Sequence, residues 1–190
     1  MEAGETAQLL VQARAGSGAA LDALYQRCAR KLLPLIRIRM GRALRAEMES
    51  RDILQAVLLK SFAKLPQVQE PAALMGWLSR IAENEIRDRA DYQNRQRRDA
   101  ARRMPIEDAA DVPAPVRLAL SQVIVNEAVE RLERALEDLP DAQREIVVLR
   151  KMEELTFPEI AARLGKTDDA CRMLFARAMT ALTLRLRRDA

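Results

Sequence analysis

Apolar side chains recur every three or four residues along most of the chain, a spacing that is typical of amphipathic α-helices. Such stripes predict helices over residues 9–13, 21–36, 54–65, 77–81 and 139–152. The first stripe stops at Gly16-Ser17-Gly18, and Pro34 is expected to interrupt or kink the second. Ser50 is expected to cap the third. The pattern therefore predicts an all-α fold.

One predicted helix changes character along its length, in the segment "GWLSRIAENEIRDRADYQNRQRRD", residues 76–99. It begins with Trp77 as an expected core anchor and becomes polar and rich in arginine. Arg80, Asn84 and Arg87 fall at positions i, i+4 and i+7, which places them on one face. A basic outer face suits an anionic partner, although the arginines from Arg95 onward also fit a solvated surface.

Two helical domains are expected, because charge and proline divide the chain. The charge runs basic, acidic and basic again, and Pro105, Pro113 and Pro115 lie in the acidic stretch. We assign residues 1–103 to a first domain, 104–120 to a flexible acidic linker, and 121–190 to a second domain. Ala, Leu and Arg dominate a chain of 190 residues with only 3 % aromatics, which favours helix over strand.

Cysteine and histidine usage bounds the chemistry. Cys28 and Cys171 are far apart and histidine is absent, so a zinc site is not expected. Two free thiols suggest a reducing compartment, and we predict a cytoplasmic protein without signal peptide or membrane span. Cys28 falls on an apolar stripe and is interpreted as a packed core thiol. The net charge of +4 fits an anionic partner without requiring one.

The segment "TFPEIAARLGKTDDACRMLFARAMTAL" predicts a helix-turn-helix. Thr156 and Glu159 have capping-box spacing, and Gly165 suits the left-handed residue that ends a helix. Thr167 can cap the second helix, and Cys171 points inward. The expected exposed side carries Thr167, Asp169, Arg172, Met173 and Arg177. Short helix hairpins also occur outside DNA-binding proteins, so the spacing alone does not establish DNA recognition.

Several motifs together resemble a known family. "SRDILQAVLLKSFAKL" and "GWLSRIAEN" in the first half, and "LPDAQREIVVLRKMEELTFPEIAARLG" in the second, are similar to sigma-70-family factors of the extracytoplasmic-function (ECF) type. The resemblance covers about Leu9 to Leu186 and implies region 2 followed by region 4, without region 3. It implies a factor that binds core bacterial RNA polymerase, directs it to specific promoters and promotes DNA melting, with no cofactor.

The resemblance also implies roles for individual residues. Core polymerase would be bound through its beta-prime clamp helices and its beta flap, and the helix with Asp52, Ile53, Gln55 and Leu58 would meet the clamp helices. The loop from Leu65 to Gly76 would capture a flipped base of the −10 element. Arg80, Asn84 and Arg87 would contact the −10 strand, and Thr167, Asp169, Arg172, Met173 and Arg177 the −35 duplex. An anti-sigma factor is a further implied partner.

Departures from the family pattern, including Ala56 and Asp168-Asp169, leave the promoter sequence undetermined. Two other classes stay open at this point. A dimeric helix-turn-helix repressor would bind DNA without polymerase, but it would leave the first domain unexplained. A nuclease or nucleotidyl transferase would need a catalytic constellation, and the sequence has no His and no Gly-rich phosphate loop. We therefore predict that the chain is not an enzyme.

Overall fold

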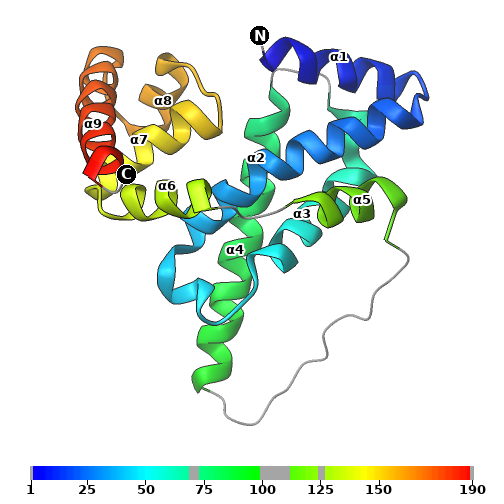
Figure 1. Ribbon diagram of the computed structural model, residues 1–190, viewed down its shortest axis with the longest axis horizontal. Coiled ribbons are helices and arrows are strands. Elements are labelled where there is room, and N and C mark those ends of the chain that lie inside the picture. Colours follow the sequence, from blue (N-terminus) through cyan, green and yellow to red (C-terminus); the bar gives the residue numbers. More distant parts are fainter. Residues whose placement is uncertain (1, 69–72, 99–111, 124–126, 189–190) are drawn as a thin grey trace. The chain divides into compact units, whose positions relative to one another are not determined.

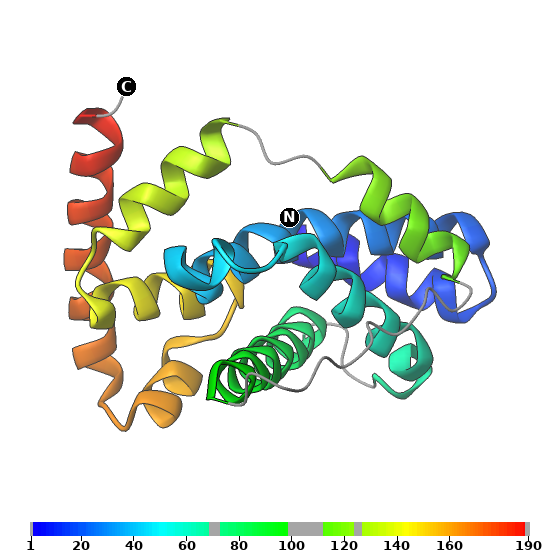
Figure 2. The same ribbon diagram turned by 90° about the horizontal axis from the view of Figure 1, so that it is seen from below.

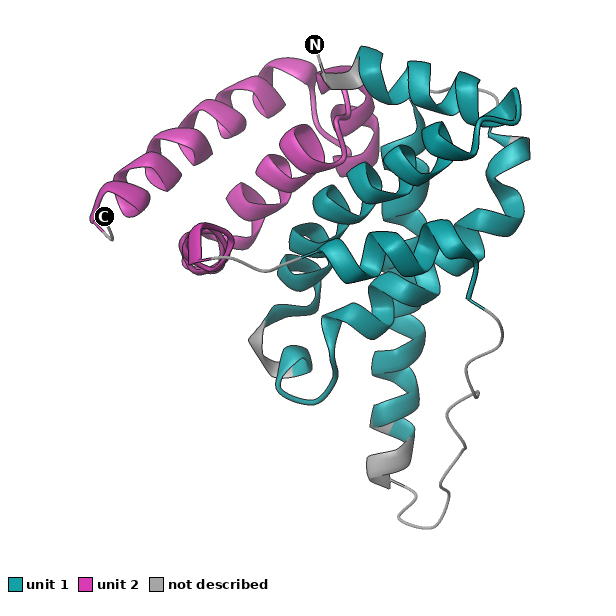
Figure 3. Ribbon diagram, turned by 45° about the vertical axis from the view of Figure 1, so that its right-hand side comes forward, with its two compact units in different colours: residues 1–123 teal, residues 124–190 magenta. Residues whose placement is uncertain are grey.

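The computed structural model describes residues 2–68, 73–98, 112–123 and 127–188. Within these ranges the regular secondary structure is helical and contains no β-strand, which confirms the predicted all-α fold. The chain divides into two compact units, residues 1–123 and 124–190 (Figure 3). Two helical units were expected, but the boundary between them lies further along the chain than the predicted linker.

The first unit is built around one long helix, α2 (Gly18–Arg45), which packs against each of the other α-helices described in the unit (Figure 1). Those helices are α1 (Glu2–Arg14), α3 (Ser50–Lys64), α4 (Leu74–Arg98) and α5 (Ala114–Gln122), with a 3-10 turn at Leu65–Gln67. Its core is aliphatic and includes the fully buried residues Leu24, Leu32, Leu33, Ile36, Leu54 and Leu78. Cys28 is buried among them as a free thiol, as the stripe predicted.

Two helix boundaries in this unit differ from the expectations. The α2 helix continues through Pro34 and has its non-helical residue at Gly41, with φ 66° and ψ 172°. Glycine reaches this conformation without a steric penalty, so the bend falls where the backbone tolerates it. Ser50 is not the cap of α3: it is buried as the first helical residue, and Glu49 occupies the cap position without a side-chain hydrogen bond.

The predicted linker, residues 104–120, also needs correction. Residues 99–111 lie outside the described part, but Ala114–Gln122 forms α5 and packs against α2 and α3. Pro115 stands in the first turn of α5, where a missing N–H costs no helical hydrogen bond. Val116, Ala119 and Val123 are buried, so this segment belongs to the core of the first unit.

The second unit packs three helices against a fourth. The helices α6 (Glu127–Glu137), α7 (Asp141–Val147) and α8 (Phe157–Leu164) all contact α9 (Asp168–Arg188), as Figure 2 shows, and a π-helical turn at Val148–Met152 follows α7. Its core contains Ile146, Leu149, Ile160, Cys171, Ala178 and Leu182. Across the described residues of both units, no helix combines the length and apolar character of a membrane span.

Candidate nucleic-acid interface

The helix-turn-helix predicted from the sequence is present in the second unit, with its caps in place. Thr156 and Glu159 form a capping box: the Glu159 amide donates to Thr156 Oγ1 at 3.5 Å, and the Thr156 amide donates to Glu159 Oε2 at 2.7 Å. Side-chain and backbone hydrogen bonds from Thr156 lower the pKa of the Glu159 carboxyl below its usual value. Gly165 ends α8 in the left-handed conformation, with φ 63° and ψ 38°. The Ala170 amide then donates to Thr167 Oγ1 at 3.2 Å, so Thr167 caps α9 as expected.

The second helix of this motif has one buried and one exposed face. Cys171, Ala178 and Leu182 point into the core, at spacings of seven and four residues. The five side chains predicted to read duplex DNA are all exposed on the same helix or at its cap: Thr167, Asp169, Arg172, Met173 and Arg177. Met173 is apolar but 57 % exposed, so it does not belong to the core of the unit. The arrangement fits a helix whose outer face meets a partner.

Arg172 has contacts that sequence spacing did not reveal. Its guanidinium pairs with Asp168 one turn earlier, at 2.9 Å from Nη2 to Oδ2, and its Cζ lies 4.7 Å from the centre of the Phe157 ring. Arg150 approaches the same ring at 5.0 Å, and the Phe175 ring meets it edge-on at 5.7 Å. Phe157 and Arg172 are fifteen residues apart, so helical periodicity could not pair them.

The three predicted −10 residues are exposed together on α4. Arg80, Asn84 and Arg87 lie on its outer face, while Leu78, Ala82 and Ile86 bury the other side. The loop predicted to capture a base, Leu65 to Gly76, is described only in part, because residues 69–72 lie outside the described ranges. Trp77 was expected to be a core anchor, and it is half-buried near the start of α4.

Acidic residues on either side of Asn84 tie α4 to two other helices. Glu83 pairs with Arg39 of α2 at 3.3 Å. Glu85 is buried and accepts from Lys60 of α3, and from Arg89 of its own helix at 2.9 Å. Burial opposes ionisation of Glu85, but the hydrogen bonds from Lys60 and Arg89 outweigh it and lower the pKa of the carboxyl. These contacts fix how α4 is rotated, and therefore where Asn84 points.

The predicted polymerase-docking set on α3 divides into exposed and buried members. Asp52 is exposed and Gln55 is half-exposed. Ile53 and Leu58 have no exposed surface, so they pack the core and cannot form part of a contact surface as the helix stands. The set is corrected accordingly, and the predicted docking surface is reduced to the polar positions Asp52 and Gln55.

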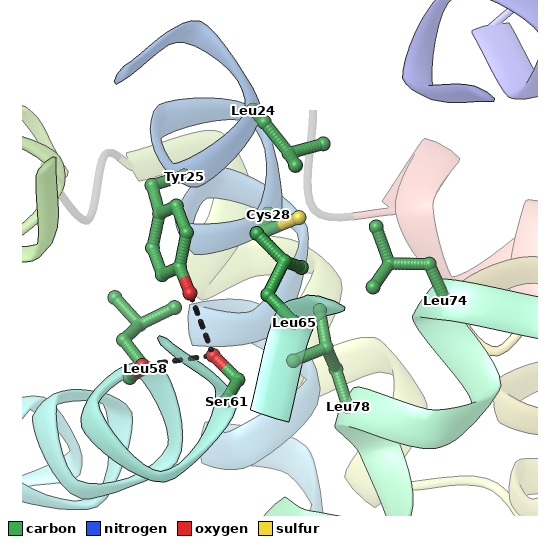
Figure 4. Close-up of a pocket in the computed structure, with 8 residues that line it drawn as sticks. All are labelled: Leu24, Tyr25, Cys28, Leu58, Ser61, Leu65, Leu74 and Leu78. Carbon is green, nitrogen blue, oxygen red and sulfur yellow. Dashed lines mark hydrogen bonds between the residues drawn. The ribbon is translucent and has the colours of Figure 1, made fainter. Parts of the chain in front are cut away.

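A small pocket lies between α2, α3 and the start of α4, but its lining is that of a core. It is bounded by Leu24, Tyr25, Cys28, Leu58, Ser61, Leu65, Leu74 and Leu78 (Figure 4). The Tyr25 hydroxyl lies 3.3 Å from Ser61 Oγ, and Ser61 donates to the Leu58 carbonyl at 2.8 Å. Burial raises the pKa of Tyr25 to about 12. These contacts satisfy the polar groups internally, which is typical of packing.

Comparison with known proteins agrees with this geometry. The family "Sigma-70, region 4" matches residues 129–182, which include α8, the turn and α9 as far as Leu182. SigM of Mycobacterium tuberculosis, an ECF RNA polymerase sigma factor, is 30 % identical over 179 residues, covering 93 % of this chain and 82 % of SigM. The chain belongs to the ECF sigma factors of RNA polymerase, within the sigma-70 family.

Other relatives extend over most of the chain as well. SigD of Mycobacterium tuberculosis is 29 % identical over 175 residues, covering 92 % of this chain and 80 % of SigD. Among solved structures, CnrH in complex with the cytosolic domain of CnrY is similar, with a TM-score of 0.50 and 24 % identity. That match covers 98 % of this chain and 99 % of CnrH, and it supports the fold.

Proposed function

We propose that this sigma factor binds core bacterial RNA polymerase and directs it to promoters through two separate DNA-binding surfaces. The exposed face of α9 would enter the major groove of the −35 duplex, where arginine can bind guanine or phosphate. The observation that carries the proposal is the capped helix-turn-helix with Thr167, Asp169, Arg172, Met173 and Arg177 on its outer side. The face of α3 with Asp52 and Gln55 would meet the polymerase.

The outer face of α4 would bind the −10 strand after it separates. Asn84 carries an amide that can hydrogen-bond a base edge, and Arg80 and Arg87 lie beside it to hold the phosphate backbone. Promoter melting would follow because an unpaired base bound at Asn84 is no longer available to its complementary strand. The −35 and −10 steps would therefore depend on different residues.

Binding to core polymerase is the first requirement of the proposal. Purified chain and core enzyme should co-elute in gel filtration, and the complex should select a consistent pair of promoter elements from a random DNA library. The chain without core enzyme should select no such pair, which separates a sigma factor from a repressor. Failure to co-elute with core enzyme would reject the proposal.

Two single variants test the separation of roles. Arg172→Ala should weaken occupancy of the promoter duplex, since a good bidentate base contact is worth about 1–3 kcal/mol. Asn84→Ala should leave −35 binding unchanged and reduce melting, measured as permanganate reactivity of thymines on a promoter that remains occupied. Melting of wild-type extent by Asn84→Ala would remove Asn84 from the −10 site. Equal loss of closed-complex binding in both variants would contradict the separation itself.

We include an anti-sigma factor among the proposed partners, because the sequence resemblance implies one. We also propose that the chain catalyses no reaction of its own. A Mg²⁺-dependent cleavage assay on duplex and single-stranded DNA tests this, and cleavage that co-purifies with the wild-type chain would contradict it.

A further inference from the structure

Two side chains hold the guanidinium of Arg172 from different directions. Arg172 Nε and Nη2 both donate to Asp168 Oδ2, at 3.1 and 2.9 Å. The Phe157 ring packs against the guanidinium, with 4.7 Å between the ring centre and Cζ. Asp168 lies one turn earlier on α9, whereas Phe157 is the first residue of α8. Both helices of the motif therefore contribute to the position of one exposed arginine.

The Phe157 ring is itself anchored. The Phe175 ring meets it at an interplanar angle of 69°, and Arg150 approaches it at 5.0 Å. Arg150 is fixed in turn, because its Nη1 donates to the Leu155 carbonyl at 2.8 Å. The capping box at Thr156 fixes the backbone next to the ring. An arginine packed against a fixed aromatic ring and held by a carboxylate loses less freedom on binding, because its side chain is already partly restrained.

The contact with Asp168 leaves one edge of Arg172 available. The carboxylate takes the edge formed by Nε and Nη2, while Nη1 and the second hydrogen of Nη2 point along the end of the side chain. This end carries two parallel donors, the arrangement with which arginine binds O6 and N7 of guanine. Asp168 Oδ1 is buried and has no hydrogen-bond partner among the described residues. Both hydrogen bonds from Arg172 therefore use the same carboxylate oxygen, Oδ2.

We propose that Phe157 and Asp168 are positioning residues that present the Nη1–Nη2 edge of Arg172 to a single guanine in the −35 duplex. Selectivity at that base pair then depends on two residues that do not themselves contact DNA. The inference rests on the proposed function, because it requires that α9 reads duplex DNA. Beyond that function, the inference states that the guanine is bound by an arginine whose side chain is held in place before DNA binds.

Double-mutant cycles distinguish positioning from simple packing. The protein is the full chain in complex with core polymerase, and the probe is the promoter duplex that the wild-type complex selects. A second set of duplexes carries each other base pair at the position where Arg172→Ala loses discrimination. We expect Arg172→Ala to reduce discrimination there by about 5- to 150-fold, the equivalent of one bidentate contact. Phe157→Leu and Asp168→Asn should each reduce it by about two- to tenfold.

The cycles give the decisive comparison. Phe157→Leu should cost nothing further in an Arg172→Ala background, and Phe157→Tyr should restore wild-type discrimination because it keeps the ring. Arg177 is the control: it is exposed on the same helix, so Phe157→Leu and Arg177→Ala should have additive effects on binding. Circular dichroism spectra should show that the variants remain folded.

Three results would overturn the inference while leaving the proposed function intact. The first is additivity of Phe157→Leu with Arg172→Ala. The second is failure of Phe157→Tyr to restore discrimination. The third is an Arg172→Ala variant that weakens all duplexes equally, which would indicate a phosphate contact. Failure of the wild-type complex to select any duplex would instead reject the proposed function.

Discussion

Asn84 shows how a single exposed residue is positioned by its neighbours in the sequence. Glu83 and Glu85 precede and follow it, and they pair with Arg39 of α2 and Lys60 of α3. Because the two acids reach different helices, rotation of α4 about its axis would break at least one pair. The exposed amide is therefore aimed by residues that a search for DNA contacts would pass over.

The ion pairs of Glu85 with Lys60 and Arg89 predict how the stability of the first unit depends on pH. The folded pKa of Glu85 lies below its usual value of 4.5, so its ionised form stabilises the fold above about pH 4.5. This stabilisation should be lost as the pH falls through the lowered pKa, because the folded state must then take up a proton. Glu85→Gln should cost about 1 kcal/mol at pH 7, since its cationic partners remain partly exposed.

Urea unfolding followed by fluorescence of Trp77, the chain's single tryptophan, measures this in the first unit. The difference in unfolding free energy between wild type and Glu85→Gln should shrink below pH 4.5. Asp88→Asn, at an exposed position of the same helix, controls for loss of one negative charge. A difference that stays constant down to pH 3 would contradict the role assigned to the ionised carboxylate.

A second prediction for individual residues concerns Asp52 and Gln55 of α3. Asp52→Arg combined with Gln55→Ala should weaken binding to core polymerase without destabilising the fold, because a charge reversal at an interface costs more than one in solvent. Gln12→Arg adds a positive charge at an exposed position of α1 and should bind normally. Surface-immobilised core enzyme gives both affinities. Equal affinity of the double variant and wild type would place the docking surface elsewhere.

Residue periodicity predicted which faces are exposed, but not every contact on them. Spacing placed Arg80, Asn84 and Arg87 on one side of α4, as found. The apolar stripe of α3 placed Leu58 in the core but did not include Ile53, and the family resemblance assigned both residues to the docking surface, whereas both are fully buried. The contact of Arg172 with Phe157 depends on how two helices cross, and a pattern along one helix contains no such information.

At the scale of elements, local chemistry predicted the ends of helices better than their interiors. The capping box at Thr156 and the left-handed Gly165 follow from interactions within a few residues, and both were confirmed. The bend in α2 was expected at Pro34 and occurs at Gly41. A proline can stay inside a helix when tertiary packing repays its lost hydrogen bond, so its effect depends on surroundings that the sequence does not show.

Replacing glycine by alanine should cost different amounts of stability at Gly41, Gly165 and Gly18. Gly41 has φ 66° and ψ 172°, a region that is essentially limited to glycine, so Gly41→Ala should cost about 1–3 kcal/mol or more. Gly165 is in the left-handed helical region, where alanine costs about 1–2 kcal/mol and asparagine less. Gly18→Ala, at the start of α2 with open space around it, should be neutral or slightly stabilising.

Asparagine substitutions distinguish the backbone conformation of Gly41 from that of Gly165. Gly165→Asn should recover part of the stability lost in Gly165→Ala, because asparagine tolerates the left-handed region, whereas Gly41→Asn should recover little. Trp77 fluorescence reports the variants of the first unit, and circular dichroism reports Gly165. Equal costs for Gly41→Ala and Gly18→Ala would contradict the backbone angles at Gly41.

At the scale of the whole molecule, α5 decides where the first unit ends. Val116 is buried and its neighbour Arg117 is exposed, so the same substitution should destabilise the unit strongly at the first position and hardly at all at the second. Val116→Asp should destabilise the first unit by at least about 3 kcal/mol, because it buries a charge without a partner. Arg117→Asp should change stability by less than about 0.5 kcal/mol. Near-identical denaturation midpoints, read by Trp77 fluorescence, would indicate that residues 114–120 behave as a linker.

Residues 104–120 were predicted to be a linker because this acidic stretch contains Pro105, Pro113 and Pro115. Pro113 and Pro115 ordinarily stop a helix, yet both precede or begin α5, where proline is favourable. The two buried residues of α5, Val116 and Ala119, are too few to form a convincing stripe by themselves, and the helices that cover them are α2 and α3. The number of units was therefore predictable, but their boundary required the tertiary structure.

The way α5 ends has a consequence for recombination between relatives. Arg51 of α3 donates to the carbonyls of Leu120, at 3.2 Å, and Val123, so the last turn of α5 is tied to the first unit. A chimaera that exchanges the second unit of this chain for that of a relative should therefore be joined at residue 124. A junction at residue 104 would import a foreign α5, so α2 and α3 would contact apolar side chains that their own surfaces do not match. Natural exchanges of the two halves are expected to follow the same boundary.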